Sequence, residues 1–342
     1  MGREKQCIEQ QGIKTISFDI KRGNVSVFQT IYNLIQRRKI CSIVQPDLIH
    51  EIALQPIVLG FIDRLLGARE KNVCSFAGFG ILMARFKERP WFLYLLKKIF
   101  PLIQKKGISI VQNKEDKQIL SYAGVKESQI RLIPGAGVDI KKYQPADSSK
   151  SEKPYLTVLM ACRLLWSKGI NEFIQAAQVL QKDKALFLNF VLCGEPDKKS
   201  NDAIGEKKLI ELTMMSKVKW IGFQENMTKI FNESDIFCLP TYYGEGIPKV
   251  LLEAMACGLP CITTNTPGCN NAVRNGINGV LIPPKNPKRL VDAILYLAKN
   301  PELRKKMGKK GRQRVLKYFS QEIIIKQTLC VYDELVRLKE KI

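Results

Sequence analysis

The sequence predicts an α/β protein with two doubly wound domains, each built on a parallel sheet. Its 342 residues exceed the roughly 100 to 200 residues of an ordinary domain, which favours two domains with a cleft between them. Short apolar runs alternate with helix-length segments throughout the second half, and the first half follows the same rhythm less completely. Such alternation is typical of parallel sheets that helices cover on both faces.

Six candidate strands occupy the second half, and all are continuous apolar runs of the kind that parallel sheets bury on both faces. They lie at residues 155–161, 187–194, 217–223, 235–240, 260–264 and 279–284. Helix-length segments such as 169–183 and 286–300 separate them. This half is therefore expected to be a complete domain of Rossmann type.

The first half carries five strand-plus-loop candidates, at residues 12–20, 45–54, 71–80, 107–114 and 129–139. A polar stretch rich in Gly, Pro, Ser and Lys, residues 133–154, is interpreted as the linker. The last helix starts near residue 320 with a Ser cap and an apolar stripe. We expect a first domain at 1–140, a second at 141–320, and a C-terminal helix at 321–342 that packs back on the first domain.

The chain is strongly basic, and this limits its partners. The 55 Lys and Arg residues outnumber the 32 Asp and Glu residues, which gives a formal net charge of +23. Such a chain attracts nucleic acid, phosphorylated small molecules or an anionic membrane surface, unless the charge is only a general background.

The ten cysteines include no C-x-x-C pair and indicate reduced cytoplasmic thiols. The single histidine, His50, excludes a metal site made of histidines.

No segment of the sequence predicts passage through a membrane. The first residues lack the apolar core of a signal peptide, and no run of about 18 apolar residues occurs. Segment 85–106 mixes Trp and other aromatic residues with many Lys and Arg residues. Such a segment can lie on an anionic bilayer surface, or it can be a surface helix of the first domain with an apolar inner face.

A loop directly after the first strand of the second half carries two cations. Arg163 and Lys168 flank a turn that ends at Gly169, where a helix begins. A helix N-terminus with two cations beside it can bind a diphosphate, because Arg chelates two oxygens and Lys supplies a point charge. In a chain with 55 such residues, two solvated surface cations are the alternative.

Two glutamates eight residues apart follow a later strand. Glu245 lies between Gly244 and Gly246, so the loop can turn tightly and a ligand can approach its backbone. Glu253 falls within the helix that Pro248 begins, in an apolar stretch where a carboxylate needs partners. The hydroxyl groups of a ribose or hexose would supply them, and so would a cap or a salt bridge to a neighbouring basic residue.

Several segments together resemble one family of enzymes. The segments "RLLWSKG", "EGIPKVLLEAMACGLPCITTNTPG", "NGINGVLIPPKNPKRLVDAI" and "NPELRKKMGKKGRQRV" occur in the order and at the spacings of the donor-binding half of retaining glycosyltransferases with the GT-B fold. The resemblance is strongest from 155 to 320. It points to the bacterial capsule, O-antigen and lipid-linked oligosaccharide transferases of the large glycogen-synthase-like family. It implies two Rossmann-like domains with a cleft between them.

The resemblance implies roles for three residues of the second half. Arg163 and Lys168 would bind the donor diphosphate and stabilise the leaving group, and Glu253 would hold the ribose hydroxyls. Positive side chains beside a helix N-terminus can neutralise a departing diphosphate without a metal ion. No metal site and no cofactor are therefore expected, and no D-x-D pair occurs in the chain. The donor substrate is expected to be a nucleotide sugar of the UDP type.

The resemblance also implies a sugar contact and a group near the reaction centre. Glu245 would contact the donor sugar, with the backbone amides of Gly246 and Ile247 beside it. His50 fits the first of one or two histidines that relatives carry there, and Ile52 stands where many relatives have the second. A lone histidine at a strand end can be structural or catalytic. The expected catalytic group consists of Glu245, His50, Arg163 and Lys168.

The chain departs from the family at its N-terminus. Relatives open with a strand, a glycine-containing loop, a helix and a second strand that have no counterpart here. At about 30 residues per strand-helix-strand unit, about 50 residues are missing. The first domain is therefore expected to be incomplete through a misassigned gene start, a natural shortening or completion by another polypeptide, and we favour the first explanation.

The resemblance implies a retaining, metal-independent glycosyltransferase that moves a hexose or N-acetylhexosamine from a UDP-sugar to a polysaccharide or lipid-diphosphate-linked acceptor. The charge and segment 85–106 fit a cytoplasmic protein that binds peripherally to the membrane. The alternatives are a nucleotide-sugar epimerase, a nucleic-acid-binding protein, and an inactive relative that binds a nucleotide sugar. The single histidine disfavours the epimerase, and the scatter of the cations disfavours specific nucleic-acid binding. The sequence does not separate the active enzyme from the inactive relative.

Overall fold

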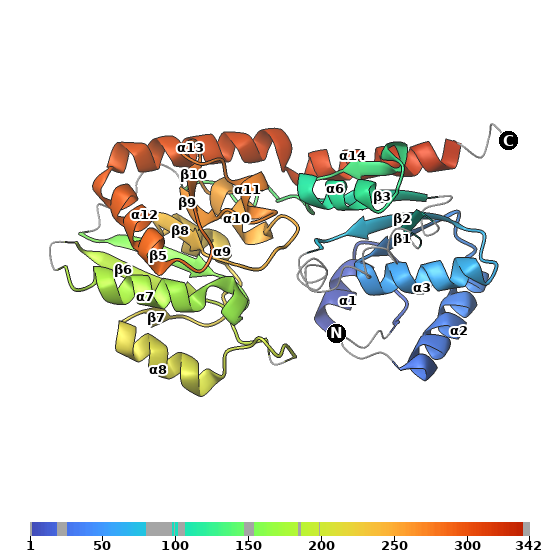
Figure 1. Cartoon of the computed structure of the whole chain (residues 1–342), viewed down its shortest axis with the longest axis horizontal. Helices are drawn as coiled ribbons and strands as arrows, with labels where there is room; N and C mark the ends of the chain where they lie inside the picture. Colours follow the sequence, from blue (N-terminus) through green and yellow to red (C-terminus); the bar gives the residue numbers. More distant parts are fainter. Residues whose placement is uncertain are drawn as a thin grey trace.

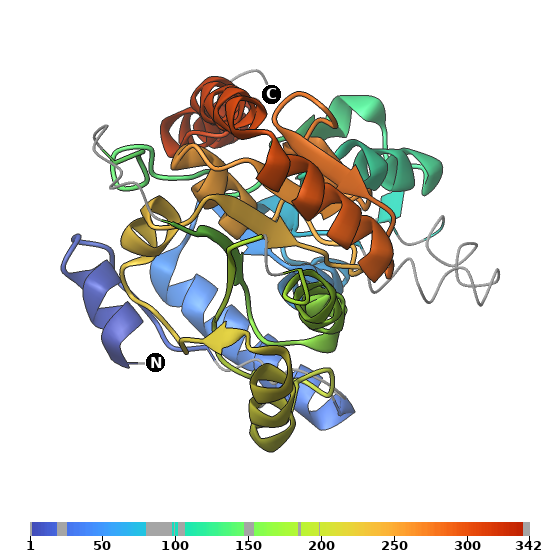
Figure 2. The same cartoon turned by 90° about the vertical axis from the view of Figure 1, so that its left-hand side faces the viewer.

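The chain folds into two halves that lie side by side, each built on a parallel sheet (Figure 1). The computed structural model describes residues 2–18, 26–79, 98, 100–101, 107–146, 154–183, 186–197 and 199–337. Figure 2 views the molecule with the second half facing the reader. Helices flank both sheets, so the predicted α/β fold of two Rossmann-like units is confirmed.

The first half holds a four-stranded sheet with its strands in sequence order. All neighbours are parallel, and His50 in the first strand lies opposite Val73 in the second. The strands are β1 (Leu48–Ile52), β2 (Lys71–Phe76), β3 (Gly107–Val111) and β4 (Ile130–Leu132). The helices that the structure describes here are α1 (Gly2–Glu9), α2 (Val27–Val44), α3 (Leu54–Leu65), α6 (Lys114–Tyr122) and the short 3-10 helix η1 (Glu127–Gln129). β3 is buried along its whole length and forms the centre of this core.

The strand expected at residues 12–20 is wrong for the part that the structure describes. Residues 13–18 form no regular element, and Ile13 and Ile16 are largely exposed. β1 is the edge strand of the sheet, and no strand in the described ranges pairs with residues 13–18. Apolar residues alone do not make a strand, because an extended segment without a neighbour leaves its backbone groups to water.

A cluster of buried charges fixes β1 against the two helices beside it. The Glu51 carboxylate in β1 accepts two hydrogen bonds from the guanidinium of Arg64 in α3, at 2.9 and 3.1 Å. Arg37 in α2 reaches the same carboxylate at 3.4 Å and also pairs with Asp63 in α3. Because these buried charges are paired with one another, the cluster holds in place the strand that carries His50.

The second half holds a six-stranded parallel sheet, and all six strands expected from the sequence are confirmed. They are β5 (Leu156–Ala161), β6 (Leu188–Cys193), β7 (Lys219–Trp220), β8 (Ile236–Leu239), β9 (Cys261–Thr264) and β10 (Gly279–Ile282). The helices are η2 (Trp166–Lys168), α7 (Ile170–Leu180), α8 (Glu206–Ser216), α9 (Met227–Asn232), α10 (Lys249–Ala256), α11 (Cys269–Ala272), α12 (Pro287–Lys299) and α13 (Pro301–Tyr318). Two apolar clusters enclose this sheet, one around Phe173 and Phe190 and the other around Phe231 and Phe237. Burial on both faces explains why the strands are continuously apolar.

The strand order of the second sheet reverses at β5. This strand lies between β6 on one side and β8 on the other, so the chain winds outward in both directions from it. In doubly wound sheets, the loops that leave the carboxyl ends of two such strands spread apart and open a crevice. The loop after β5 carries Lys168, and the loop after β8 carries Glu245. The topology therefore brings these two residues to the same place.

Two crossings of the chain join the halves, and they are hydrogen-bonded to each other. Val138 N donates to Phe319 O at 2.9 Å, and Gln321 N donates to Val138 O at 3.0 Å. After the second crossing, α14 (Gln321–Arg337) lies on the first half, where it contacts β3 (Figure 1). Three apolar residues of α14 join an apolar cluster there: Ile324, Val331 and Leu335.

Some expectations concern parts of the chain that the structure describes little or not at all. Segment 85–106 is described only at residues 98, 100 and 101, so its contact with a membrane surface stays a prediction. Among the helices of the described ranges, none is long and apolar enough to cross a bilayer. The nine cysteines whose side chains the structure describes form no disulfide bond, and most of them are buried.

We expect Gly308→Ala in α13 to destabilise the second half. A Cβ atom at Gly308 would lie 2.0 Å from the carbonyl oxygen of Gly258, which follows α10. Overpacking of this kind costs about 1–3 kcal/mol. Gly311→Ala in the same helix is the control, because its Cβ atom would lie 3.5 Å from Met255 and helix propensity would gain up to about 1 kcal/mol. Urea unfolding followed by circular dichroism measures both variants, and equal midpoints would contradict the close contact at Gly308.

Candidate active site

The turn after β5 places a lysine at the crevice between β5 and β8. η2 forms this turn, and α7 starts directly after Gly169, as the sequence predicts. Gly169 has φ +84°, and a Cβ atom there would lie 2.2 Å from the carbonyl oxygen of Pro240 at the end of β8. Glycine is the residue that fits such a position. Lys168 is thereby held at the N-terminus of α7, with only 7% of its surface exposed.

Lys168 forms an ion pair with Glu245. Lys168 Nζ contacts Glu245 Oε1, and the Glu245 side chain is 21% exposed. Two hydrogen bonds tie the same two loops together, because Tyr242 N and Thr241 Oγ1 donate to Ser167 O at 3.0 and 3.1 Å. An ammonium group has three donors. The pair therefore leaves donors of Lys168 available to an incoming anion.

Arg163 lies at the rim of the crevice and does not join this pair. Its side chain is 59% exposed, and Nη1 lies 2.9 Å from Asp197 Oδ2 after β6. An exposed ion pair of this kind contributes little to stability. The guanidinium can thus exchange Asp197 for an anion that it binds through two oxygens. The structure brings Lys168 and Glu245 together and holds Arg163 apart from them.

Glu253 lies on α10 and has partners of its own. Its carboxylate lies 3.9 Å from Lys249 Nζ and accepts a hydrogen bond from Tyr143. Burial raises the pKa of Glu253, although Lys249 and Tyr143 oppose the shift. Burial and the Glu253 carboxylate also raise the pKa of Tyr143. The salt bridge that the sequence left open is present, and the contact of Glu253 with a ribose stays a prediction.

The backbone after Glu245 reaches across to the first half. Gly246 N donates to Ala77 O at 3.0 Å, and Ile247 N donates to Gln112 Oε1 at 3.1 Å. These are the two amides that the sequence places beside a donor sugar. In this structure both are bonded to groups of the first half, so a ligand that uses them must displace those groups.

Sequence reasoning missed the side chains of the first half that make these contacts. Asn113 Nδ2 donates to Asp116 Oδ2 at 2.9 Å and to Glu245 O at 3.4 Å, while its Oδ1 accepts from Asp116 N at 2.7 Å. Asp116 Oδ1 also accepts from Phe79 N at 3.2 Å. The pattern Asn-x-x-Asp at the start of α6 was a signal for this helix cap. It does not predict the contact with Glu245.

His50 is anchored at both ring nitrogens. Nδ1 lies 2.6 Å from Tyr332 Oη in α14, and Nε2 lies 2.6 Å from Ser75 Oγ in β2. A neutral imidazole donates from one nitrogen and accepts at the other, so both positions are in use. Burial lowers the pKa of His50, which favours the neutral ring. A catalytic role for His50 stays a prediction, and it requires the exchange of one of these partners.

A cavity of about 360 Å³ lies between the first sheet and α14. Polar side chains that face it include His50, Ser75, Gln112 and Thr328. Gln112 is the member of this set that also reaches the second half, through Ile247 N. Gln112 therefore lies between this cavity and the loop that carries Glu245.

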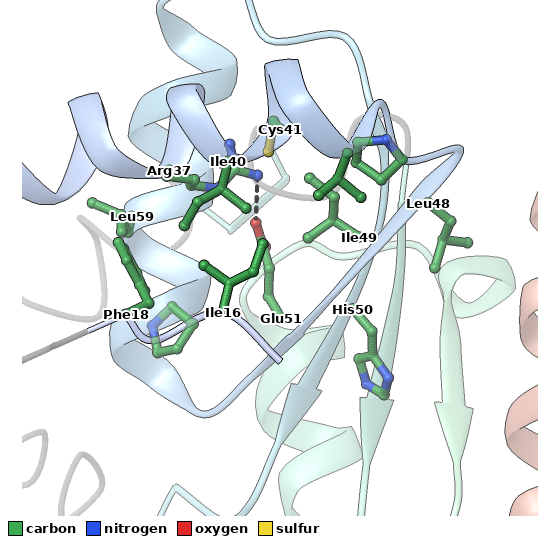
Figure 3. Close-up of a pocket in the computed structure, with 13 residues that line it drawn as sticks. Ile16, Phe18, Arg37, Ile40, Cys41, Leu48, Ile49, His50, Glu51 and Leu59 are labelled. Atoms are coloured by element: carbon green, nitrogen blue, oxygen red, sulfur yellow. Dashed lines mark hydrogen bonds and ion pairs between the residues drawn. The ribbon is translucent and has the colours of Figure 1, made fainter. Parts of the chain in front are cut away.

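A second cavity, of about 410 Å³, lies on the other side of β1, between this strand, α2 and α3. Figure 3 shows the Arg37–Glu51 ion pair among apolar side chains such as Ile40 and Leu59. Both charges of this pair already belong to the buried cluster that supports β1. This cavity is apolar and belongs to the structural support of the strand.

The arrangement at the crevice suits a ligand that combines an anionic part with hydroxyl groups. Lys168 and the N-terminus of α7 can bind the anion, and the Glu245 carboxylate can accept from hydroxyls. Within the described ranges, no three or more His, Cys, Asp or Glu side chains gather as metal ligands. The site thus offers a buried cation, Lys168, together with helix amides and a carboxylate.

Two Rossmann-like halves with a cation and a carboxylate at the strand reversal of the second half define the class of GT-B enzymes. Comparison with known proteins identifies the family. Residues 142–314 match the family described as "Glycosyl transferases group 1", and this match covers half of the chain. The chain belongs to this family and is a glycosyltransferase.

Similar proteins match along most of the chain. The N,N'-diacetylbacillosaminyl-diphospho-undecaprenol alpha-1,3-N-acetylgalactosaminyltransferase of Campylobacter jejuni is 28% identical, over 97% of this chain and 89% of that protein. The UDP-Gal:alpha-D-GlcNAc-diphosphoundecaprenol alpha-1,3-galactosyltransferase of Escherichia coli is 26% identical, over 82% of this chain and 72% of that protein. The crystal structure of a glycosyltransferase from Rickettsia africae has a TM-score of 0.80 at 20% identity, over 98% of this chain and 88% of that one. This last similarity shows the fold alone.

Asp116 makes the stability of the folded chain dependent on pH. Burial raises the pKa of its carboxyl from 3.8 to about 6, although hydrogen bonds from Phe79 and Asn113 oppose the shift. The folded protein therefore holds this proton more tightly than the unfolded chain does. The resulting stabilisation is fully present below about pH 4 and is lost as the pH rises through about 6. We expect the free energy of unfolding to fall by up to roughly 3 kcal/mol across this window.

Asp116→Asn should flatten this part of the profile, because the amide does not titrate. Urea unfolding at several pH values between about 4 and 8 measures it. Asp292→Asn, which removes an exposed carboxylate from α12, is the control and should leave the profile as it is. An Asp116→Asn profile parallel to that of the wild type would show that Asp116 is not the titrating group.

Proposed function

We propose that the protein is a retaining glycosyltransferase that transfers a hexose or N-acetylhexosamine from a UDP-sugar to a saccharide on a lipid diphosphate or a polysaccharide, in cell-surface glycan synthesis. One observation carries this proposal: Lys168 and Glu245 meet at the N-terminus of α7, in the crevice between β5 and β8. The names of the relatives support it. The Escherichia coli protein is named for UDP-Gal and a diphosphoundecaprenol acceptor, and the Campylobacter jejuni protein is named for a diphospho-undecaprenol acceptor.

In this proposal the diphosphate of the donor binds at the N-terminus of α7. Lys168 supplies a point charge, and Arg163 leaves Asp197 to chelate two phosphate oxygens. Fixed cations and helix amides stabilise the negative charge that develops as the diphosphate departs, so this role needs neither a metal ion nor a cofactor. Arg163 and Lys168 thus act on the leaving group.

The donor sugar and its nucleoside bind on either side of the diphosphate. Glu245 accepts hydrogen bonds from sugar hydroxyls, and the amides of Gly246 and Ile247 donate to sugar oxygens. Glu253 holds the ribose hydroxyls, which then replace Lys249 as partners of its carboxylate. Ribose hydroxyls are suitable because they satisfy a largely buried carboxylate without adding charge.

A second candidate is a relative that binds the nucleotide sugar without turnover. The observation that favours it is the anchoring of His50, whose two nitrogens are held by Ser75 and Tyr332. In the active enzyme, an acceptor hydroxyl replaces one of these partners. In the inactive relative, His50 only joins β1, β2 and α14.

We also propose that the protein acts at the cytoplasmic face of the membrane, where a lipid-diphosphate acceptor is presented. Its net charge of +23 supports attraction to anionic head groups, at about 1 kcal/mol for each Lys or Arg near the surface. Specific nucleic-acid binding is not part of this proposal.

Glu253→Ala should weaken the binding of UDP by at least about tenfold, because hydrogen bonds to a charged group contribute about 1.5–3 kcal/mol. Isothermal titration calorimetry with UDP measures this on the full chain. Glu206→Ala in the first turn of α8 is the control, and it should bind UDP like the wild type. Equal binding by Glu253→Ala would exclude Glu253 from the ribose site. A folded wild-type protein that does not bind UDP would exclude a UDP-sugar donor.

Turnover separates the two candidates. We expect the protein to consume a UDP-sugar in the presence of a short-chain prenyl-diphosphate saccharide and to release UDP. Nuclear magnetic resonance of the product should show the same anomeric configuration as the donor. An inverted product would contradict the retaining mechanism, and UDP-sugar binding without product for any donor or acceptor tried would favour the inactive relative.

A further inference from the structure

Gln112 joins the first half to the backbone amide of Ile247. Its Oε1 accepts a hydrogen bond from Ile247 N at 3.1 Å, and a Cβ atom on Gly246 would lie 1.8 Å from the same oxygen. The oxygen therefore lies directly against the loop that follows Glu245. Gln112 is the first residue after β3, so the buried strand fixes its backbone while its side chain extends toward the second half.

The amides of Gly246 and Ile247 have hydrogen-bond partners that differ in how easily they can move away. Gly246 N is bonded to a backbone oxygen, that of Ala77. A Cβ atom on Gly78, where φ is +112°, would lie 2.5 Å from Gly246 N, so this contact is backbone against backbone. It opens only if the halves separate. Gln112 contacts Ile247 through a side chain with rotatable bonds, and this side chain can turn away while the halves stay together.

The cavity beside Gln112 can receive its side chain. This cavity, of about 360 Å³, is lined by Gln112 together with Ser75 and Thr328. Ser75 Oγ bonds to His50 Nε2, and Thr328 Oγ1 donates to Ile324 O. Each hydroxyl oxygen has two lone pairs, so it can accept from the Gln112 amide group. The side chain thus has a second position in which its polar atoms can be satisfied.

We propose that Gln112 competes with the donor sugar for the Ile247 amide and thereby determines how much more tightly a UDP-sugar binds than UDP does. The inference rests on the proposed function, in which Glu245 and Ile247 face the sugar. A sugar oxygen that reaches Ile247 N takes the hydrogen bond that Gln112 gives up. UDP alone has no group at this position and leaves Gln112 on the amide. Gln112 therefore discriminates between UDP and a UDP-sugar, and it does so through the Ile247 amide.

The test compares UDP with UDP-glucose and UDP-N-acetylglucosamine on the wild type and on Gln112→Ala, by isothermal titration calorimetry. Without Gln112, Ile247 N has no protein partner to lose when the sugar binds. We expect Gln112→Ala to bind a UDP-sugar about 2- to 10-fold more tightly than the wild type and to bind UDP equally well. Equal binding of UDP also shows that the variant is folded. Gln181→Ala at the end of α7 is the control and should change neither affinity.

Gln112→Glu tests the competition in the opposite direction. Its carboxylate accepts more strongly from Ile247 N, so a UDP-sugar should lose more affinity than UDP does. If the ratio of UDP-sugar to UDP affinity is the same in the wild type, Gln112→Ala and Gln112→Glu, the inference is wrong while the proposed function stands. If the wild type does not bind UDP, the proposed UDP donor fails and the inference fails with it.

Discussion

Close backbone contacts at glycines hold the loop that carries Glu245 between the two halves. A Cβ atom on Gly78 would lie 2.5 Å from Gly246 N, and one on Gly268 would lie 1.7 Å from Gly246 O. Gly78 and Gly268 also have φ of +112° and +85°, where other residues are strained. Because the backbone of Gly78 and that of Gly268 contact this loop from two sides, the Glu245 carboxylate points to Lys168 and not to solvent. The geometry of the candidate active site depends on this constraint.

Each half contains a buried ion pair, and the two pairs have different roles. The pair in the first half supports a strand, and the pair in the second half can exchange its partners. Glu51 is bonded to Arg37 and Arg64 behind β1, and all three side chains are at most 14% exposed, so these paired charges form a firm support. Lys168 is equally buried, but its partner Glu245 stands at a crevice. An isolated ammonium at this depth would be unfavourable, so Glu245 compensates it while no anion is bound. A diphosphate can take over that task and leave Glu245 to bind hydroxyls.

Local patterns predicted the second half and the pairing of its loops. Continuous apolar strands are a local property, and once Lys168 and Glu245 stand at strand ends, the strand reversal makes them neighbours. Patterns did not predict the contacts of His50 with Tyr332, 282 residues away, or of Gln112 with Ile247, 135 residues away. His50 and Gln112 are single polar residues at or next to a strand, and neither changes the pattern of apolar residues from which these contacts would have to be predicted. The strand at 12–20 was wrong for residues 12–18 because a sequence shows apolar residues, but not whether a neighbouring strand is there to pair with them.

The paired crossings at Val138 determine which contacts would change if the two halves rotated relative to each other. Both crossings meet at the Val138 backbone, so a rotation about this point would separate Ala77 from Gly246 while α14 stayed on the first half. His50 keeps its bond to Tyr332 in such a motion, because both residues lie on the first half. Such a rotation would therefore change the contacts of the Glu245 loop and leave those of His50 unchanged. A group that replaced Ser75 as the partner of His50 Nε2 would have to enter the cavity that Ser75 and His50 line.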